Sequence, residues 1–119
     1  PWIRQKNNPF PIFEEDGFYL EDAVWLSRYR DDVSPPSEEA RDNILPGTYA
    51  KLLFRFAAEN AERQPNDTER MWVLVQESMD DCYVGTVAND PIHSGVLACG
   101  DEVHFHPSHV MAVLDEGSA

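Results

Sequence analysis

From residue 48 onward, apolar and polar residues alternate in short runs that are separated by turn residues. Between residues 48 and 56, Ala50, Leu52 and Phe54 fall on one side of an extended chain, and the residues between them fall on the other. Alternation of this kind is typical of half-buried β-strands. We therefore expect about five short strands, near residues 48–56, 71–76, 83–88, 103–106 and 109–114.

The residues between these runs favour an antiparallel sheet that bends strongly. Asn89-Asp90-Pro91 predicts a turn in which the Asn and Asp side chains bond their own backbone. Gly85 permits a bulge or bend inside its strand. A strand, a one-turn break and a last strand also form the end of small barrels of the SH3 type. The pattern leaves residues 92–97 unassigned.

The first third of the chain has a different pattern. Residues 1–18 contain Pro9 and Pro11, which exclude a helix interior and predict an extended arm across the core. Apolar residues at helical spacing predict a helix from Leu20 to Arg30, and a second, short helix from Ser34, with Pro35 in its first turn, to about Ile44. The fold class is therefore a single α+β domain, with the arm and helices in 1–45 and the sheet in 46–114.

The charge of the chain is extreme for its size. Nine Lys and Arg against 22 Asp and Glu give a net charge of −13 on 119 residues. Such a field repels nucleic-acid phosphates and anionic membranes and attracts cationic surfaces. We therefore expect no nucleic-acid partner and no membrane partner. The charge has two interpretations, either a basic protein partner or the maintenance of solubility alone.

Two cysteines, Cys82 and Cys99, lack the spacing of a redox pair or a zinc set. Both are expected to be buried free thiols, and a disulfide between them would require export. Reduced thiols fit a cytoplasmic protein. The chain begins at Pro1 without Met, which points to a processed or trimmed product.

Several motifs of the sheet region suggest a family. Over residues 38–113 the chain resembles the bacterial domain of unknown function 2314 family, on the motifs Pro46-Gly47-x-Tyr49-x-Lys51, Glu69-Arg70-Met71-Trp72-Val73-x-Val75, Gly85-x-Val87-x-Asn89-Asp90-Pro91 and Gly100-Asp101-x-Val103-x-Phe105. The chain departs from it in the acidic loop 59–69 and at Ala50. The family has no activity to carry over, so the resemblance implies a fold and little chemistry.

The loop 59–69 is the first candidate for a binding site. It carries Glu59, Glu62, Asp67 and Glu69, offset only by Arg63. An acidic loop on a rigid sheet is suited to meeting a cationic surface quickly. The alternative interpretation is a tolerated polar insertion.

Two aromatic residues of neighbouring strands are the second candidate. Trp72 and Tyr83 could pair across adjacent strands, which would stabilise the sheet. If the pair is exposed, it becomes a candidate for the centre of a binding surface, because Trp and Tyr dominate binding energies.

Three histidines provide an alternative function. His104 and His106 lie two apart on one strand face, and His109 follows after a turn. Such a set, completed by Cys99, Asp101 or Glu102, would suit a divalent metal or a small molecule. The competing interpretation is the solvent face of an amphipathic strand, and no bound metal or cofactor is expected.

The chain shows no motif for catalysis. It lacks the nucleophile elbow, the phosphate-binding glycine loop and the zinc-protease helix. We therefore expect a non-enzymatic module that binds a basic protein, such as an immunity-type inhibitor of a basic toxin or nuclease. The oligomeric state is not indicated.

Overall fold

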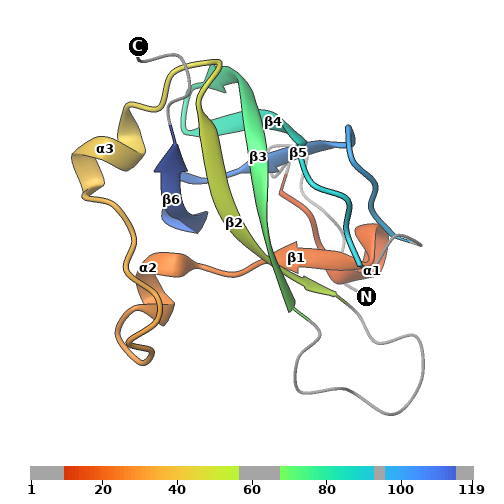
Figure 1. Ribbon diagram of the computed structural model, residues 1–119, viewed down its shortest axis with the longest axis horizontal. Coiled ribbons are helices and arrows are strands. Elements are labelled where there is room, and N and C mark those ends of the chain that lie inside the picture. Colours follow the sequence, from red (N-terminus) through yellow and green to blue (C-terminus); the bar gives the residue numbers. More distant parts are fainter. Residues whose placement is uncertain (1–9, 57–67, 93–95, 115–119) are drawn as a thin grey trace.

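The computed structural model describes residues 10–56, 68–92 and 96–114 of the chain, and it has the expected α+β architecture (Figure 1). The helices are α1 (Phe13–Asp16), α2 (Ala23–Leu26) and α3 (Glu38–Asp42). The strands are β1 (Phe18–Leu20), β2 (Tyr49–Phe56), β3 (Thr68–Met79), β4 (Cys82–Val87), β5 (Glu102–Phe105) and β6 (Val110–Leu114), and the 3-10 turn η1 is Pro107–His109.

The six strands form one antiparallel sheet that curls into a half-barrel (Figure 1). Strands β2 to β5 pair in chain order, and β6 returns after η1 to the edge of β2 that β3 leaves open. There Tyr49 lies opposite Leu114, while Phe56, at the other end of β2, lies opposite Phe18 of β1. Strand β5, the turn η1 and strand β6 form the strand, one-turn break and last strand that the sequence predicted.

The inner face of the curled sheet holds the main core. Leu52, Phe54, Val73 and Phe105 are each fully buried there. Removing one such side chain from water contributes about 1.5–3 kcal/mol. The outer face of β2 has its own small cluster, in which Leu53 packs with residues from α2 and β6. Helix α2 thus covers the part of the outer face that surrounds Leu53.

Helix α1 and strand β1 correct the expected irregular arm of residues 1–18. Phe18 and Leu20 alternate with Tyr19, and both are buried against Phe54 and Phe56 of β2. The backbone N–H of Glu21 continues this pairing with a 3.0 Å bond to the carbonyl of Leu53. The pairing explains why the predicted helix from Leu20 to Arg30 is shortened to α2, since its first residues already belong to the sheet.

The helices that do form are short. Helix α2 begins after Asp22, whose carboxylate accepts a 2.9 Å bond from the N–H of Trp25. Helix α3 begins after Ser37, whose hydroxyl accepts from Ala40 at 3.2 Å, and the predicted start at Ser34 is wrong. Within the described residues, no helix has the length and apolar character needed to span a bilayer.

The bend expected at Gly85 is confirmed. Strand β3 carries an extra residue between Val75 and Glu77, directly opposite Gly85 and Val84 of β4. A Cβ atom on Gly85 would lie 2.5 Å from a methyl carbon of Val73 and 2.7 Å from the carbonyl oxygen of Leu74. The two strands approach so closely here that glycine is required.

Candidate binding surface

The acidic loop lies mostly beyond what the structure describes. Glu59, Glu62 and Asp67 fall outside the described residues, so their role stays a prediction. Glu69 is on β3, and its carboxylate accepts a 3.0 Å hydrogen bond from the backbone N–H of Ile92. This bond ties β3 to the chain that follows β4, so Glu69 has a structural contact of its own.

Trp72 does not pair with Tyr83. The register of β3 and β4 places Ser78 opposite Tyr83, while Trp72 lies beyond Val73 toward the far end of the strand. The cross-strand neighbour of Trp72 is Lys51 of β2, whose Nζ atom lies 5.4 Å from the centre of the indole ring. This distance permits a cation–π attraction on the half-buried outer face. The two strands predicted for this pair are correct, but the predicted register is wrong.

Tyr83 is a core residue, so the exposed aromatic pair considered as a binding surface is not present. Its side chain is only 3% exposed and its ring stacks on Phe105 with 5.4 Å between ring centres. The hydroxyl donates a 2.8 Å bond to the carbonyl of Arg41 and accepts a 3.2 Å bond from the N–H of Ile44. Tyr83 therefore fastens the end of α3 to β4.

The histidines organise the turn between β5 and β6. Nδ1 of His109 accepts a 2.9 Å bond from the N–H of His106, and Nδ1 of His106 accepts a 3.1 Å bond from the N–H of Ser108. Burial, then the ring of His106, lower the pKa of His109 to about 4, against a smaller opposite effect of Asp22. His104 lies on β5 itself. In the described part of the chain, no three His, Cys, Asp or Glu residues are grouped to hold a metal ion.

The two thiols differ in environment. Cys82 is a free thiol at the start of β4 but only half-buried, so the expected burial is met in part. Burial, with Asp80 and Asp81, raises its pKa. Cys99 is exposed, so the expectation of two buried thiols is wrong for this residue. It lies in the turn before β5 and not on a strand. A raised pKa disfavours the thiolate that nucleophilic attack needs.

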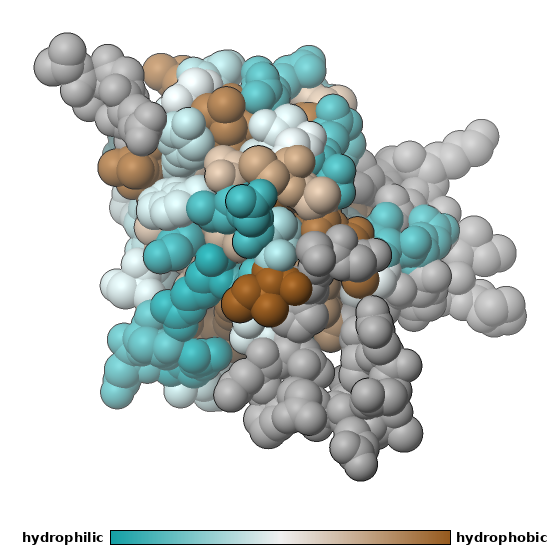
Figure 2. Space-filling view, turned by 45° about the vertical axis from the view of Figure 1, so that its right-hand side comes forward, coloured by the Kyte–Doolittle hydropathy of each residue, from teal (hydrophilic) through white to brown (hydrophobic). Residues whose placement is uncertain are grey.

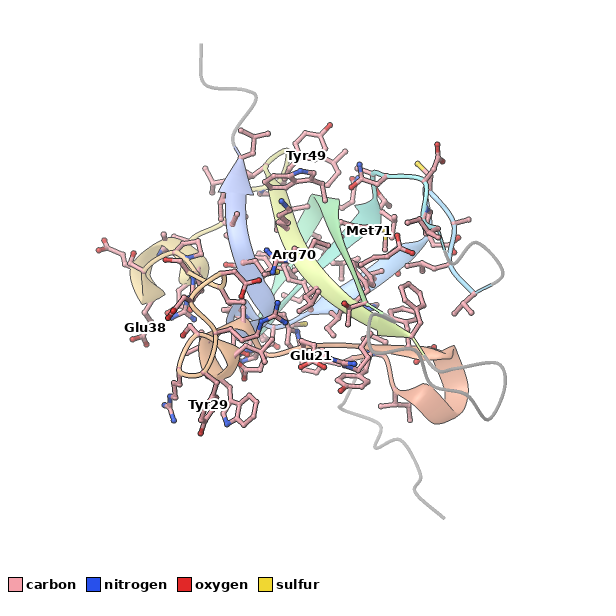
Figure 3. The ribbon with its side chains drawn as sticks, turned by 60° about the horizontal axis from the view of Figure 1, so that its bottom comes forward. Glu21, Tyr29, Glu38, Tyr49, Arg70 and Met71 are labelled. Carbon is pink, nitrogen blue, oxygen red and sulfur yellow. The ribbon has the colours of Figure 1, made fainter. Side chains whose placement is uncertain are left out.

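Three arginines form ion pairs with Glu21 and Asp32, acidic residues that lie before and after α2. Arg55 bonds Glu21 at 2.6 Å, and Arg30 and Arg70 both bond Asp32, at 2.7 and 2.6 Å. In Figure 3, Arg70 and Glu21 lie on the same side of the sheet, and Tyr29, in the turn after α2, points away from it. These pairs neutralise part of the acidic charge in this region.

The part of the sequence after Arg70 has no basic residue that could provide such compensation. After Arg70 the chain contains no Lys or Arg, but it contains eight acidic residues. Counting charges separately in each half of the sequence reveals this asymmetry, whereas the net charge of the whole chain hides it. Within the described residues, this part of the chain therefore carries acidic side chains without a basic one, most of them in the turns between strands.

Two clefts lie on this acidic side. The first, which we call the seam cleft, has a volume of about 450 Å³ between α1 and β5. Four carboxylates line it, together with His104 and apolar side chains; they are Glu15, Asp16, Asp101 and Glu102.

The second cleft, the hairpin cleft, has a volume of about 870 Å³ at the turn between β3 and β4. Asp42, Asp80 and Asp81 line it, beside apolar surface from Phe10 and Met79. His104 lines the seam cleft and His106 lines the hairpin cleft. The two clefts therefore lie one after the other along β5 and the turn that follows it. Neither cleft has Lys or Arg among its described lining residues.

The visible surface mixes small apolar areas with hydrophilic ones (Figure 2). Exposed apolar side chains such as Leu45 and Ile92 occur, but the view shows no broad apolar face. Comparisons with protein families, with curated proteins and with solved structures give no match to this chain. The resemblance to the domain of unknown function 2314 family stays a prediction.

Proposed function

We propose that this domain is a non-enzymatic protein-binding module whose acidic side receives a basic protein partner. The observation that carries the proposal is the separation of charge. Arginines near α2 are consumed in ion pairs with Glu21 and Asp32, whereas two clefts beside β5 are lined by carboxylates without a basic residue in their described lining. Carboxylates gathered in clefts focus an attractive field on a cationic surface.

The same field selects against other ligands. Nucleic-acid phosphates and anionic lipid headgroups are repelled, because binding them requires cations that can replace their counterions. A protein that itself binds phosphates presents a cationic site of complementary sign. The most specific form of the proposal is therefore an immunity-type inhibitor that covers the basic active site of a toxin or nuclease. In this form the domain acts in the cytoplasm, where its free thiols stay reduced.

The experiment compares two variants with equal loss of charge. Asp80→Asn with Asp81→Asn removes two charges from the hairpin cleft, and Glu38→Gln with Glu39→Gln removes two from exposed positions on α3. Partners captured at low salt are identified, and the association rate of each purified basic partner is measured with all three proteins. We expect a reduction of about tenfold for the cleft variant and a much smaller one for the α3 variant.

Two outcomes would contradict the proposal. The first is that no basic protein is retained at low salt and released at about 0.5 M salt, where charges are screened within a few ångströms. The second is an equal loss in both variants, which would mean that the charge acts diffusely and serves solubility. The inhibitor form is tested separately, by measuring the partner's own activity with and without the domain.

A further inference from the structure

The open edge of β5 is a second property of the seam cleft. Strand β5 is the last strand in the order of the sheet, and it pairs with β4 along one edge. On its other side, Glu102 to Phe105 make no backbone hydrogen bond with the described residues. An edge of this kind presents N–H and C=O groups that can pair with another strand.

The hydrogen-bond alternation identifies the groups that face outward. The N–H of Val87 donates a 2.9 Å bond to the carbonyl of Asp101. Bonded and non-bonded pairs alternate along an antiparallel ladder, so Val103 bonds β4 opposite Gly85, whereas His104, opposite Val84, does not. The N–H of His106, two residues on, likewise turns away from β4 and bonds His109. The N–H and C=O groups of Glu102 and His104 therefore point to the open side.

The seam cleft lies along this edge. Glu15 and Asp16 of α1 form part of its wall, and Phe18 and Leu97 supply apolar surface. Its volume of about 450 Å³ is within the range of ligand sites, about 300–1,000 Å³. A strand placed there would send alternate side chains to opposite faces. Acidic and apolar groups on the walls match a segment in which basic and apolar residues alternate.

We propose that an extended basic segment of the partner adds to β5 as a new antiparallel or parallel strand in the seam cleft. This inference rests on the proposed function, because it states how the basic partner engages. Main-chain bonds to Glu102 and His104 supply affinity, and the carboxylates of the cleft select Lys and Arg on the segment. Charge complementarity thus defines the occupant.

Hydrogen exchange of the full chain, with a synthetic peptide of alternating Lys and Val as the probe, tests the pairing directly. In the free protein, the amide of Val103 is expected to be protected and that of His104 to exchange rapidly. Addition of the peptide should slow the exchange of His104 by at least tenfold. Rapid exchange at saturating peptide would overturn the proposal. Protection of His104 without peptide would also overturn it, since the edge would then be occupied by the chain itself or, if concentration-dependent, by a second copy.

A pair of variants isolates the backbone donor. His104→Pro removes the outward N–H at an edge position, where proline is tolerated, and His104→Ala removes the side chain but keeps the donor. We expect about tenfold weaker peptide binding for His104→Pro, as the loss of a main-chain hydrogen bond implies, and little change for His104→Ala. Equal affinities of the two variants would argue against strand addition.

Chemical change of the probe keeps the test independent of protein folding. Two versions of the peptide can be made, with N-methyl groups on one or the other set of alternate backbone nitrogens. Only one version blocks the N–H groups that face β5. That version should not bind and the other should bind, whereas equal binding of the two would contradict the inference. If the Asp80 and Asp81 variant weakens a natural partner while His104→Pro does not, the proposed function stands and strand addition fails. If neither change has an effect, both fail.

Discussion

The imidazole of His109 accepts a 2.9 Å hydrogen bond at Nδ1 from the backbone N–H of His106 and thereby closes the turn that joins β5 to β6. The ring of Phe10 packs edge-on against His109, with 5.5 Å between ring centres. A protonated His109 cannot accept this bond, because both its nitrogens would then be donors. The joint between the last two strands therefore depends on a neutral imidazole.

This dependence predicts a loss of stability in mild acid. The pKa of His109 is lowered to about 4 in the folded protein, below the ordinary value of 6.5, so the unfolded chain takes up its proton first as the pH falls. The stabilisation is complete above about pH 6.5 and disappears toward pH 4. Its size is on the order of 3 kcal/mol, and urea unfolding at a series of pH values measures it.

The variant His109→Asn provides the control for this titration. Asn offers an oxygen close to the position of Nδ1 and cannot be protonated, so its curve should fall less steeply than that of the parent between pH 6.5 and 4. Parallel curves would show that other groups cause the acid sensitivity.

The bonds of Tyr83 predict a cost for a single oxygen atom. Tyr83→Phe leaves the carbonyl of Arg41 and the buried N–H of Ile44 without this partner. We expect a loss of about 1–3 kcal/mol in the free energy of unfolding. Tyr29→Phe is the matched control, since Tyr29 is 69% exposed and should tolerate the change. Similar small effects at both positions would contradict a structural role for the Tyr83 hydroxyl.

The close approach at Gly85 predicts a steric penalty. Gly85→Ala places a methyl group against the side chain of Val73 and the carbonyl of Leu74. We expect a destabilisation of about 1–3 kcal/mol or more, measured by thermal or urea unfolding. The added change Val73→Ala should recover only part of it, because the backbone contact remains. Full recovery would mean that the backbone is able to move aside.

The shared carboxylate of Asp32 predicts unequal effects of its two partners. Arg30 bonds both carboxylate oxygens, at 3.0 and 2.7 Å, whereas Arg70 bonds one. Together they lower the pKa of Asp32 to about 2, with the hydrogen bonds of Arg30 as the largest cause. Arg30→Ala should therefore raise this pKa more than Arg70→Ala, as an NMR titration would measure. The reverse order would disprove the assigned geometry.

The strands were predictable because their alternation is local. Each of the five expected runs from residue 48 onward corresponds to a strand, and Gly85 lies at the bend. Strand β1 was missed because it has three residues, and its partners Phe54 and Phe56 lie far along the chain. The helix predicted from Leu20 to Arg30 forms only as the short α2 for a related reason. Leu20 joins the sheet, Ala23 packs in the small outer cluster, and Trp25 is 52% exposed.

The candidate surface was less predictable, because residue types do not determine register. Trp72 and Tyr83 lie on the expected neighbouring strands, but the register of these strands keeps them apart. Trp72 lies beside Lys51, and the ring of Tyr83 stacks on Phe105. The histidines were recognised as a group, but their bonds to the backbone become visible only in three dimensions. The absence of Lys and Arg after Arg70, in contrast, could have been found by counting charges in each half of the sequence.

The return of β6 to β2 has a consequence for the order of folding. Each hairpin from β2 to β5 joins neighbours in sequence and can form while synthesis continues, but Tyr49 must wait for Leu114 before its strand is paired on both edges. Contacts between such distant positions slow folding, because a long loop must close first. A nascent chain that stalls before β6 emerges would expose Leu53 and the flank of β2, which a chaperone could recognise.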